Sequence, residues 1–233
     1  MSEHMYSENV YFPDVFKGCR HKCVYCKPSF QRQAKRQKNR CKKCYTFEPH
    51  FHRERLIHRA PKTIGKQFVF FPKGGDLAFA HPMHILEMLN YAKDNPQTTF
   101  LMQTKDPKWM MQHRFSKNTI LAITLETNRT QFDTPSKFKN YYEISLAPLP
   151  FTRAANFFGV THDRKAVIIE PILQHNSFLA DMIRPIKPEF VYVGYDNHNC
   201  NLPEPTLTET KELVKTLGKF TRKVSKKATC FSW

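Results

Sequence analysis

Cys19-Arg-His-Lys-Cys23-Val-Tyr-Cys26 brings three cysteines together in a C-x3-C-x2-C spacing, with an aromatic residue directly before the third. A closed structural zinc site or iron–sulfur cluster normally takes four ligands from the protein. Three thiolates therefore predict a cluster with one metal atom left open to a ligand that is not protein. Half of a zinc ribbon, or three unrelated thiols, is the alternative interpretation.

The residues on either side of this motif predict an α/β protein. Short apolar strands are expected at 10–16, 68–71, 99–103, 120–125, 167–170 and 190–194. Helices are expected at 82–95, 106–110, 176–184 and 207–220, so strands and helices alternate. Such repeated units favour a partial (βα)6 barrel with parallel strands, three quarters of the eight-unit barrel. The whole chain, 1–233, is then one domain.

Three segments depart from this alternation of strands and helices. A basic insert at 27–66 follows the cysteine motif and contains a second cysteine pair. A second insert at 130–164 is expected to carry one more strand at 141–147. A basic tail is expected at 221–233.

Polar residues follow almost every predicted strand. Ligands of parallel α/β sheets bind at the carboxyl ends of the strands. The residues expected to meet at that edge are the cysteine motif, Gly74, Gly75, Asp76, Thr104, Lys105, Glu126, Thr127, Asn128, Glu170 and Asp196.

The formal net charge of +17, from 37 basic and 20 acidic residues, predicts a polyanionic partner. It is unevenly spread, since residues 17–66 hold 16 Lys and Arg against Glu48 and Glu54. Nucleic acid is the favoured partner, and a solvated basic surface is the alternative. The longest apolar runs are too short to span a membrane. The first twelve residues lack the pattern of a signal peptide, so we expect a cytoplasmic protein whose seven cysteines are metal ligands or free thiols.

The cysteine motif resembles the signature of the radical SAM enzymes. Tyr25 occupies the usual aromatic position, and Gly74-Gly75-Asp76 resembles the Gly-Gly-Glu motif of that family, with an acid one methylene shorter. The resemblance implies a [4Fe–4S] cluster on the three cysteines and S-adenosylmethionine bound at its open iron. It also implies a 5′-deoxyadenosyl radical as the reactive species, and an electron donor such as flavodoxin or ferredoxin.

Four further segments resemble small phage and prokaryotic radical SAM proteins that are loosely related to spore photoproduct lyase. They are Phe100–Lys105, Ile123–Glu126, Ile169–Ile172 and Val191–Gly194. The resemblance implies that Lys105 pairs with the carboxylate of S-adenosylmethionine. It implies that Glu126 or Asn128 binds the ribose, and that Glu170 faces substrate or cofactor. For each of these four residues, a buried polar group satisfied by the backbone is the alternative.

A second candidate metal site follows in the insert. Cys41 and Cys44 form a C-x2-C pair, and His50 and His52 follow closely, a ligand set that suits tetrahedral zinc. A second iron–sulfur cluster that uses Cys200 or Cys230 is a competing interpretation, and ordinary thiols are a third. The aromatic residues Phe30, Tyr45, Phe47 and Phe51 are candidates for stacking on bases, or for a small core of the insert.

Cys200 follows the sixth predicted strand. Spore photoproduct lyase uses a cysteine as hydrogen-atom donor, and the resemblance implies this role for Cys200, with a passive thiol as the alternative. No role is predicted for Cys230.

The sequence therefore predicts a radical SAM enzyme that modifies or repairs nucleic acid or a nucleotide. A small anionic substrate is the variant of this prediction. A zinc-dependent nucleic-acid-binding module without catalysis is the rival prediction, and a radical SAM fold that binds the cofactor without chemistry is a third.

Overall fold

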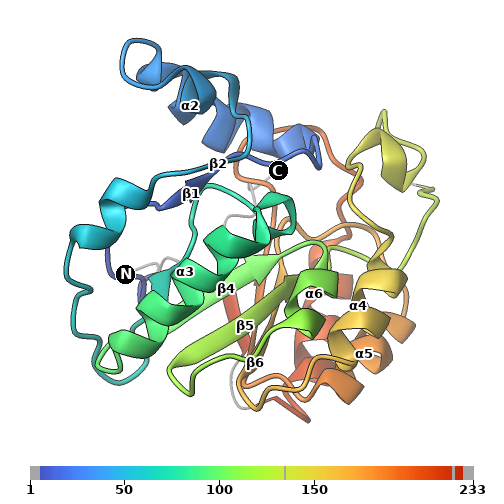
Figure 1. Cartoon of the computed structure of the whole chain (residues 1–233). Helices are drawn as coiled ribbons and strands as arrows, with labels where there is room; N and C mark the ends of the chain where they lie inside the picture. Colours follow the sequence, from blue (N-terminus) through green and yellow to red (C-terminus); the bar gives the residue numbers. More distant parts are fainter. Residues whose placement is uncertain (1–5, 134, 222–223, 228–233) are drawn as a thin grey trace.

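The computed structural model describes residues 6–133, 135–221 and 224–227, and six parallel strands form its main sheet (Figure 1). In sheet order they are β3 (Val69–Phe70), β4 (Phe100–Thr104), β5 (Thr119–Thr124), β6 (Lys165–Ile169), β7 (Phe190–Gly194) and β8 (Val224–Lys227). Sequence order and sheet order coincide, as expected for successive strand–helix units. The predicted partial barrel of parallel strands is confirmed.

A second, two-stranded sheet pairs β1 (Phe16–Lys17) with β2 (His50–Phe51) in antiparallel register. The α-helices are α1 (Arg32–Ala34), α2 (Lys42–Thr46), α3 (Pro82–Asp94), α4 (Pro150–Phe158), α5 (Phe178–Ile183) and α6 (Leu207–Leu217). The 3-10 turns are η1 (Val24–Cys26), η3 (Lys35–Gln37), η4 (Arg53–Ile57), η5 (Leu77–Phe79), η6 (Pro107–Gln112), η7 (Tyr141–Glu143) and η8 (Arg184–Ile186), and η2 (Lys27–Gln31) is a π-helix. Figure 1 shows the insert with α2 projecting from the main sheet, beyond β1 and β2.

Helix α3 illustrates how local sequence signals set an element. The His81 side chain caps the helix by accepting a hydrogen bond from the Met83 amide, and Pro82 occupies the first turn, where no amide donor is needed. Its buried residues Ile85, Met88, Leu89 and Ala92 recur at helical spacing and pack into the main core.

The strands bury both faces, and alternate residues belong to two different cores. Phe100, Met102, Leu121 and Ile123 join the large core that the helices cover. The residues between them point to the other face of the sheet, because side chains alternate along a strand. There they form a smaller core, which contains Phe68, Leu101, Ile120, Ala122, Ala166, Ile168 and Tyr192.

Tyr6 packs against this smaller core. Its ring makes edge contacts with Phe70 and Tyr192, at centroid distances of 5.1 and 5.4 Å. The residues just after it pair with the edge of the sheet through a parallel bridge between Asn9 and Phe68. The start of the described chain thus covers one end of the inner face of the sheet.

Two predicted strands are wrong. In the segment 10–16 only Phe16 lies in a strand, because the apolar residues Phe12 and Val15 are buried in the large core and Pro13 has no amide to donate. In 141–147 the backbone forms η7, whose start is fixed by reciprocal hydrogen bonds between Asn140 and Glu143.

Several elements were not predicted, among them α1, α2 and β2 in the first insert. Helix α4 lies inside the second insert, and β8 lies inside the segment expected to be a basic tail. β8 pairs in parallel with β7 and takes the sixth position in the sheet. Cys230 falls outside the described residues. Within the part of the chain that the structure describes, no helix combines the length and apolarity that crossing a membrane requires.

Candidate active site

A cavity of about 400 Å³ lies at the carboxyl ends of the strands. The predicted site residues that line it are Cys19, Cys23, Tyr25, Cys26, Gly74, Gly75, Asp76, Lys105 and Glu170. They come from four separate parts of the chain. The predicted convergence of polar residues at this edge of the sheet is therefore present for most of the set.

Strand alternation explains why polar side chains enter this cavity. Leu101 in β4 belongs to the inner core, so Gln103 two residues later points to the same face. In β5 the inner residue Ala122 is followed by Thr124, and after β6 the inner residue Ile168 is followed by Glu170. Each strand is thus apolar at its start and polar where it reaches the cavity.

Backbone contacts hold the cysteine motif against the Gly-Gly-Asp loop. Gly18 and Gly75 form a parallel bridge, in which the Gly18 amide donates to Gly74 at 3.1 Å and the Asp76 amide donates to Gly18 at 3.3 Å. A side chain on Gly75 would meet Phe16 at 2.9 Å. Glycine is required there because the two loops approach so closely.

The three thiols lie in the cavity wall in a buried setting. Burial and the neighbouring Cys23 thiol raise the pKa of Cys26 to about 12, and burial together with Asp76 raises the pKa of Cys19. The Cys23 sulfur lies 3.1 Å from the Ser145 hydroxyl. The three neighbouring thiols, of which Cys23 is buried and Cys19 and Cys26 are half-buried, form a ligand set that suits a metal centre, because a nearby cation favours the thiolate form.

Asp76 is an anchor for the surrounding loops. Its carboxylate accepts hydrogen bonds from the Thr104 hydroxyl at 2.6 Å, the Lys105 amide at 2.8 Å and the Ala78 amide at 3.0 Å. The His21 ring lies 3.2 Å from it. Burial opposes the charge of Asp76, but the hydrogen bonds from His21 and Thr104 outweigh burial and lower its pKa. Because these contacts occupy the Asp76 carboxylate, the neighbouring backbone of Gly74 and Gly75 is the part of this loop that is left to contact a ligand.

Glu126 lies behind the cavity wall, fully buried. It accepts hydrogen bonds from Tyr25 and Arg153, both at 2.7 Å, and it forms an ion pair with Lys105. The Lys105 amine also lies 5.1 Å from the centre of the Tyr25 ring. Glu126 therefore positions two residues that line the cavity, Tyr25 and Lys105.

Arg153 is the functional residue that the sequence analysis missed. It lies on α4, is fully buried, and donates to Glu126, to the Thr124 carbonyl at 2.6 Å and to the Tyr141 hydroxyl at 2.7 Å. An arginine on the apolar face of this helix, between Pro150 and Phe157, was the signal available in the sequence.

The remaining predicted residues lie in different surroundings. Glu170 lines the cavity and accepts hydrogen bonds from Tyr6 at 2.5 Å and Asn197 at 3.1 Å. Asn128 lies on a loop, where its side chain donates to Asn176. Cys200 packs beside the small core around Tyr141, and burial raises its pKa to about 12.

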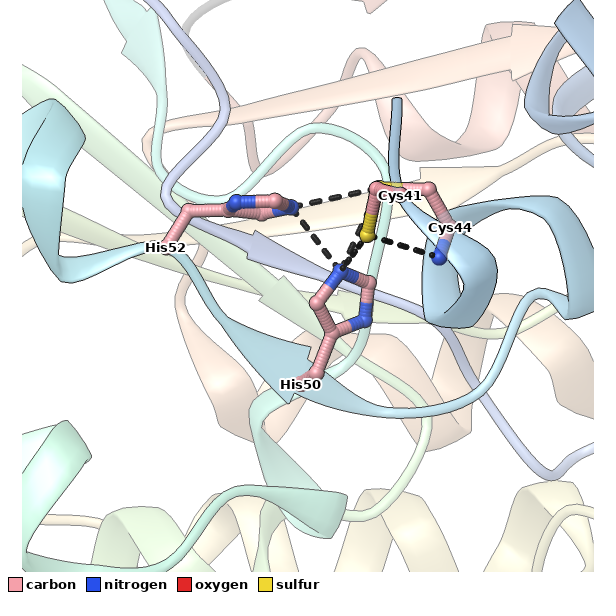
Figure 2. Close-up of side chains that lie close together, drawn as sticks. All are labelled: Cys41, Cys44, His50 and His52. Carbon is pink, nitrogen blue, oxygen red and sulfur yellow. Dashed lines mark hydrogen bonds between the residues drawn. The ribbon is translucent and has the colours of Figure 1, made fainter. Parts of the chain in front are cut away.

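The second cysteine pair forms a compact group with the two histidines of the insert (Figure 2). One ligand atom from each of Cys41, Cys44, His50 and His52 lies within 4.8 Å of all the others. His50 begins β2 and His52 follows it by two residues, so the alternation of a strand places both rings on the same side. The predicted grouping of these four residues is present.

No family model and no curated protein matches the chain. Three solved structures are similar to it. The crystal structure of Streptococcus suis SuiB bound to S-adenosylmethionine aligns with a TM-score of 0.52 at 12% identity, over 92% of this chain and 49% of SuiB. The same protein bound to its precursor peptide SuiA aligns with a TM-score of 0.48 at 11% identity, over 92% of this chain and 47% of that chain. A radical SAM methyltransferase from Sphaerobacter thermophilus aligns with a TM-score of 0.48 at 10% identity, over 93% of this chain and 67% of the methyltransferase.

The chain thus spans about half the length of SuiB and shares its fold. That fold is found in a protein whose crystal structure holds S-adenosylmethionine, which agrees with the fold expected for a radical SAM enzyme. The narrower likeness to spore photoproduct lyase stays a prediction.

Proposed function

We propose that this protein is a radical SAM enzyme whose cluster is bound by Cys19, Cys23 and Cys26. One observation carries the proposal: these three thiols share a single cavity with the Gly74-Gly75 backbone, at the carboxyl ends of parallel strands. A zinc-binding module has no need of such a cavity, so the enzyme is favoured over the rival prediction.

The residues present fit an iron–sulfur cluster and its cofactor. Burial raises the pKa of the Cys19 and Cys26 thiols, so both gain from a shared cationic centre, and three protein ligands leave one position open. The cavity volume of about 400 Å³ lies within the range of roughly 300–1,000 Å³ that is typical of small-molecule sites. When bound, the cluster and S-adenosylmethionine would together supply radical chemistry.

The protein's own residues bind, orient and shield. The Gly74 and Gly75 backbone would accept hydrogen bonds from a ligand ammonium group, and Lys105, whose pKa burial lowers to about 7, is held against Glu126. Tyr25 presents a ring fixed through its hydroxyl. Glu170, held by Tyr6 and Asn197, is the acid that would face a substrate. The proposal includes an external reductant such as flavodoxin or ferredoxin.

We infer further that the substrate is nucleic acid or a nucleotide within it. Nine exposed basic side chains lie between Lys22 and Lys43, in the segment that also contributes Ser29, Phe30 and Gln33 to the cavity lining. Phe30 is 39% exposed, so its ring is available to a base. Basic groups beside a cavity with an accessible aromatic ring suit a phosphate backbone that presents a base.

The decisive experiment is anaerobic reconstitution with iron and sulfide, followed by reduction, addition of S-adenosylmethionine and assay of 5′-deoxyadenosine. The variant with Cys19, Cys23 and Cys26 all changed to alanine should lose both bound iron and product. Cys200→Ala, which removes a thiol outside the lining, should keep its iron content. A triple variant that still bound a full cluster would contradict the proposal.

A further inference from the structure

We propose that Cys41, Cys44, His50 and His52 bind one structural Zn²⁺ ion, which fastens the basic insert to the loop that carries the three cluster cysteines. This inference does not rest on the radical SAM proposal, because it uses a different set of residues. It chooses zinc over a second iron–sulfur cluster and over ordinary thiols.

The geometry of the four ligand atoms suits one ion. The Nε2 atoms of His50 and His52 are 2.8 Å apart, and the Cys44 sulfur lies 3.2 Å from each of them. The Cys41 sulfur lies 3.4 Å from the His50 Nε2. Tetrahedral zinc with bond lengths of about 2.0–2.3 Å separates its ligands by roughly 3.3–3.8 Å. A four-iron cluster binds its ligands at separate corners and needs a wider group.

The other ring nitrogens of both histidines are already engaged. The His50 Nδ1 lies 2.7 Å from the Glu48 carbonyl oxygen, and the His52 Nδ1 lies 2.8 Å from the Glu54 carboxylate. Both acceptors require a proton on Nδ1, so in the neutral rings the two Nε2 atoms carry lone pairs. Two lone pairs that face each other at 2.8 Å repel, and a cation between them removes the repulsion.

These contacts are also the ones that support metal-bound histidines. Zinc-binding imidazoles usually donate their second N–H to a carbonyl or carboxylate, which fixes the tautomer and the ring orientation. The Cys41 sulfur is also held in position, because it accepts a hydrogen bond from the Cys44 amide at 3.2 Å. Binding would release one proton from each thiol, and two thiolates would neutralise the charge of Zn²⁺.

The site is joined directly to the cluster loop. The zinc ligand His50 pairs with Lys17 across β1 and β2, two residues before Cys19. Between the zinc ligands lies Phe47, which lines the active-site cavity. Loss of zinc should therefore free the insert and remove part of the cavity wall, in addition to exposing two thiols.

The test measures zinc and iron in the full chain, purified without oxygen. We expect one zinc per chain in the natural protein. Cys44→Ala and His52→Ala should each lose it, whereas the exposed His58→Ala should keep it. The variant that lacks Cys19, Cys23 and Cys26 should also keep its zinc, which separates this site from the cluster.

Glu54→Gln retains all four ligands. It therefore keeps the proposal testable even if the alanine variants fail to fold. It should weaken zinc binding about 10- to 100-fold in a competition with a chromogenic chelator. Replacement of zinc by Co²⁺ should give the visible absorption of a tetrahedral cobalt–thiolate site, and this absorption should be absent in Cys44→Ala.

Limited proteolysis tests independently whether the zinc ion holds the insert in place. Removal of zinc by a chelator should make the basic residues of the insert, from Lys35 to Lys43, cleavable by trypsin before the rest of the chain. Iron in place of zinc at Cys41 and Cys44, or zinc content unchanged by Cys44→Ala and His52→Ala, would overturn the proposal.

Discussion

Gly18 lies against the backbone of Glu48 so closely that a Cβ atom on Gly18 would come within 2.2 Å of the Glu48 carbonyl carbon and oxygen. Gly18 directly precedes the cluster ligand Cys19, and the Glu48 carbonyl accepts from His50 of the proposed zinc site. The two candidate metal centres thus meet at this backbone contact, next to the pairing of β1 with β2, and a change at the contact should affect both.

Gly18→Ala should therefore lower the iron and the zinc content together. The backbone of Gly18 has a φ of +92°, where a side chain costs about 1–2 kcal/mol, and the clash with Glu48 adds about 1–3 kcal/mol. Gly65→Ala is the matched control, because Gly65 also has a positive φ of +62° but has no atom within 4 Å of the added Cβ. Thermal denaturation and metal analysis of both variants check the prediction, which fails if the two variants behave alike.

Arg153→Met should destabilise the protein by about 3–5 kcal/mol, because it leaves the Glu126 carboxylate buried without its main hydrogen-bonding partner. Arg164→Met breaks a half-exposed ion pair with Glu189 and should cost about 0–1 kcal/mol. Urea denaturation at equal metal loading measures both changes. Equal losses would show that Arg153 has no special role in holding Glu126.

Asp14 should make stability depend on pH. Its carboxylate accepts from the Lys73 amide at 3.0 Å and supports the Gly74 loop, and burial raises its pKa to about 6. Between pH 4 and 6 the unfolded carboxyl loses its proton while the folded one keeps it, so rising pH favours unfolding. The shift corresponds to about 3 kcal/mol, which partial exposure to solvent reduces to about 1–2 kcal/mol.

Asp14→Asn should remove this decline, so the difference in stability between the natural protein and the variant should change across pH 4–6 and level off above pH 7. The comparison cancels the titration of other groups, because both proteins contain them. Parallel stability curves at all pH values would contradict the raised pKa.

The basic insert should account for the salt dependence of nucleic-acid binding. Changing Lys35, Arg36 and Lys38 to alanine should reduce the slope of log K against log salt by about 2–3 if all three contact phosphates. Lys93, Arg114 and Lys117 are also exposed but lie outside the insert, and their triple alanine variant is the charge-matched control. Fluorescence anisotropy with a labelled oligonucleotide measures both slopes, and equal slopes would assign binding to overall charge alone.

The sequence correctly predicted those strands of the barrel whose continuous apolar pattern matches their burial in the folded sheet. Ile120 to Leu125 is apolar except for Thr124, as expected for a parallel strand covered on both faces, and it forms β5 with one residue of difference at each end. Segment 10–16 is also rich in apolar residues, but it packs most of their side chains in the core and only Phe16 pairs in a ladder. Composition alone does not separate these cases, because burial in a core and burial in a sheet select the same residues.

A site residue was predictable where it and its neighbours in the sequence form a recognisable chemical motif. Cys19, Cys23 and Cys26 carry their own signal, and so do Gly74 and Gly75. Arg153 does not, since its role depends on α4 packing beside Glu126, 27 residues earlier in the chain. His50 and His52 are only two residues apart, and the extended backbone of β2, which begins at His50 and ends just before His52, accounts for how both rings reach one point.

The packing beneath the cavity has a kinetic consequence. Leu101, Ile120, Ile168 and Tyr192, with Tyr6 against them, fill the inner face of the sheet below the cavity. In the described part of the chain, this end of the inner face is filled, so we expect the proposed small cofactor and larger substrate both to enter at the opposite end, where the cavity lies. A polymer lying across the basic insert would cover whatever is bound beneath it. For such a polymer, the expected order is that the small molecule binds first, the polymer second, and spent cofactor leaves only after the polymer has gone.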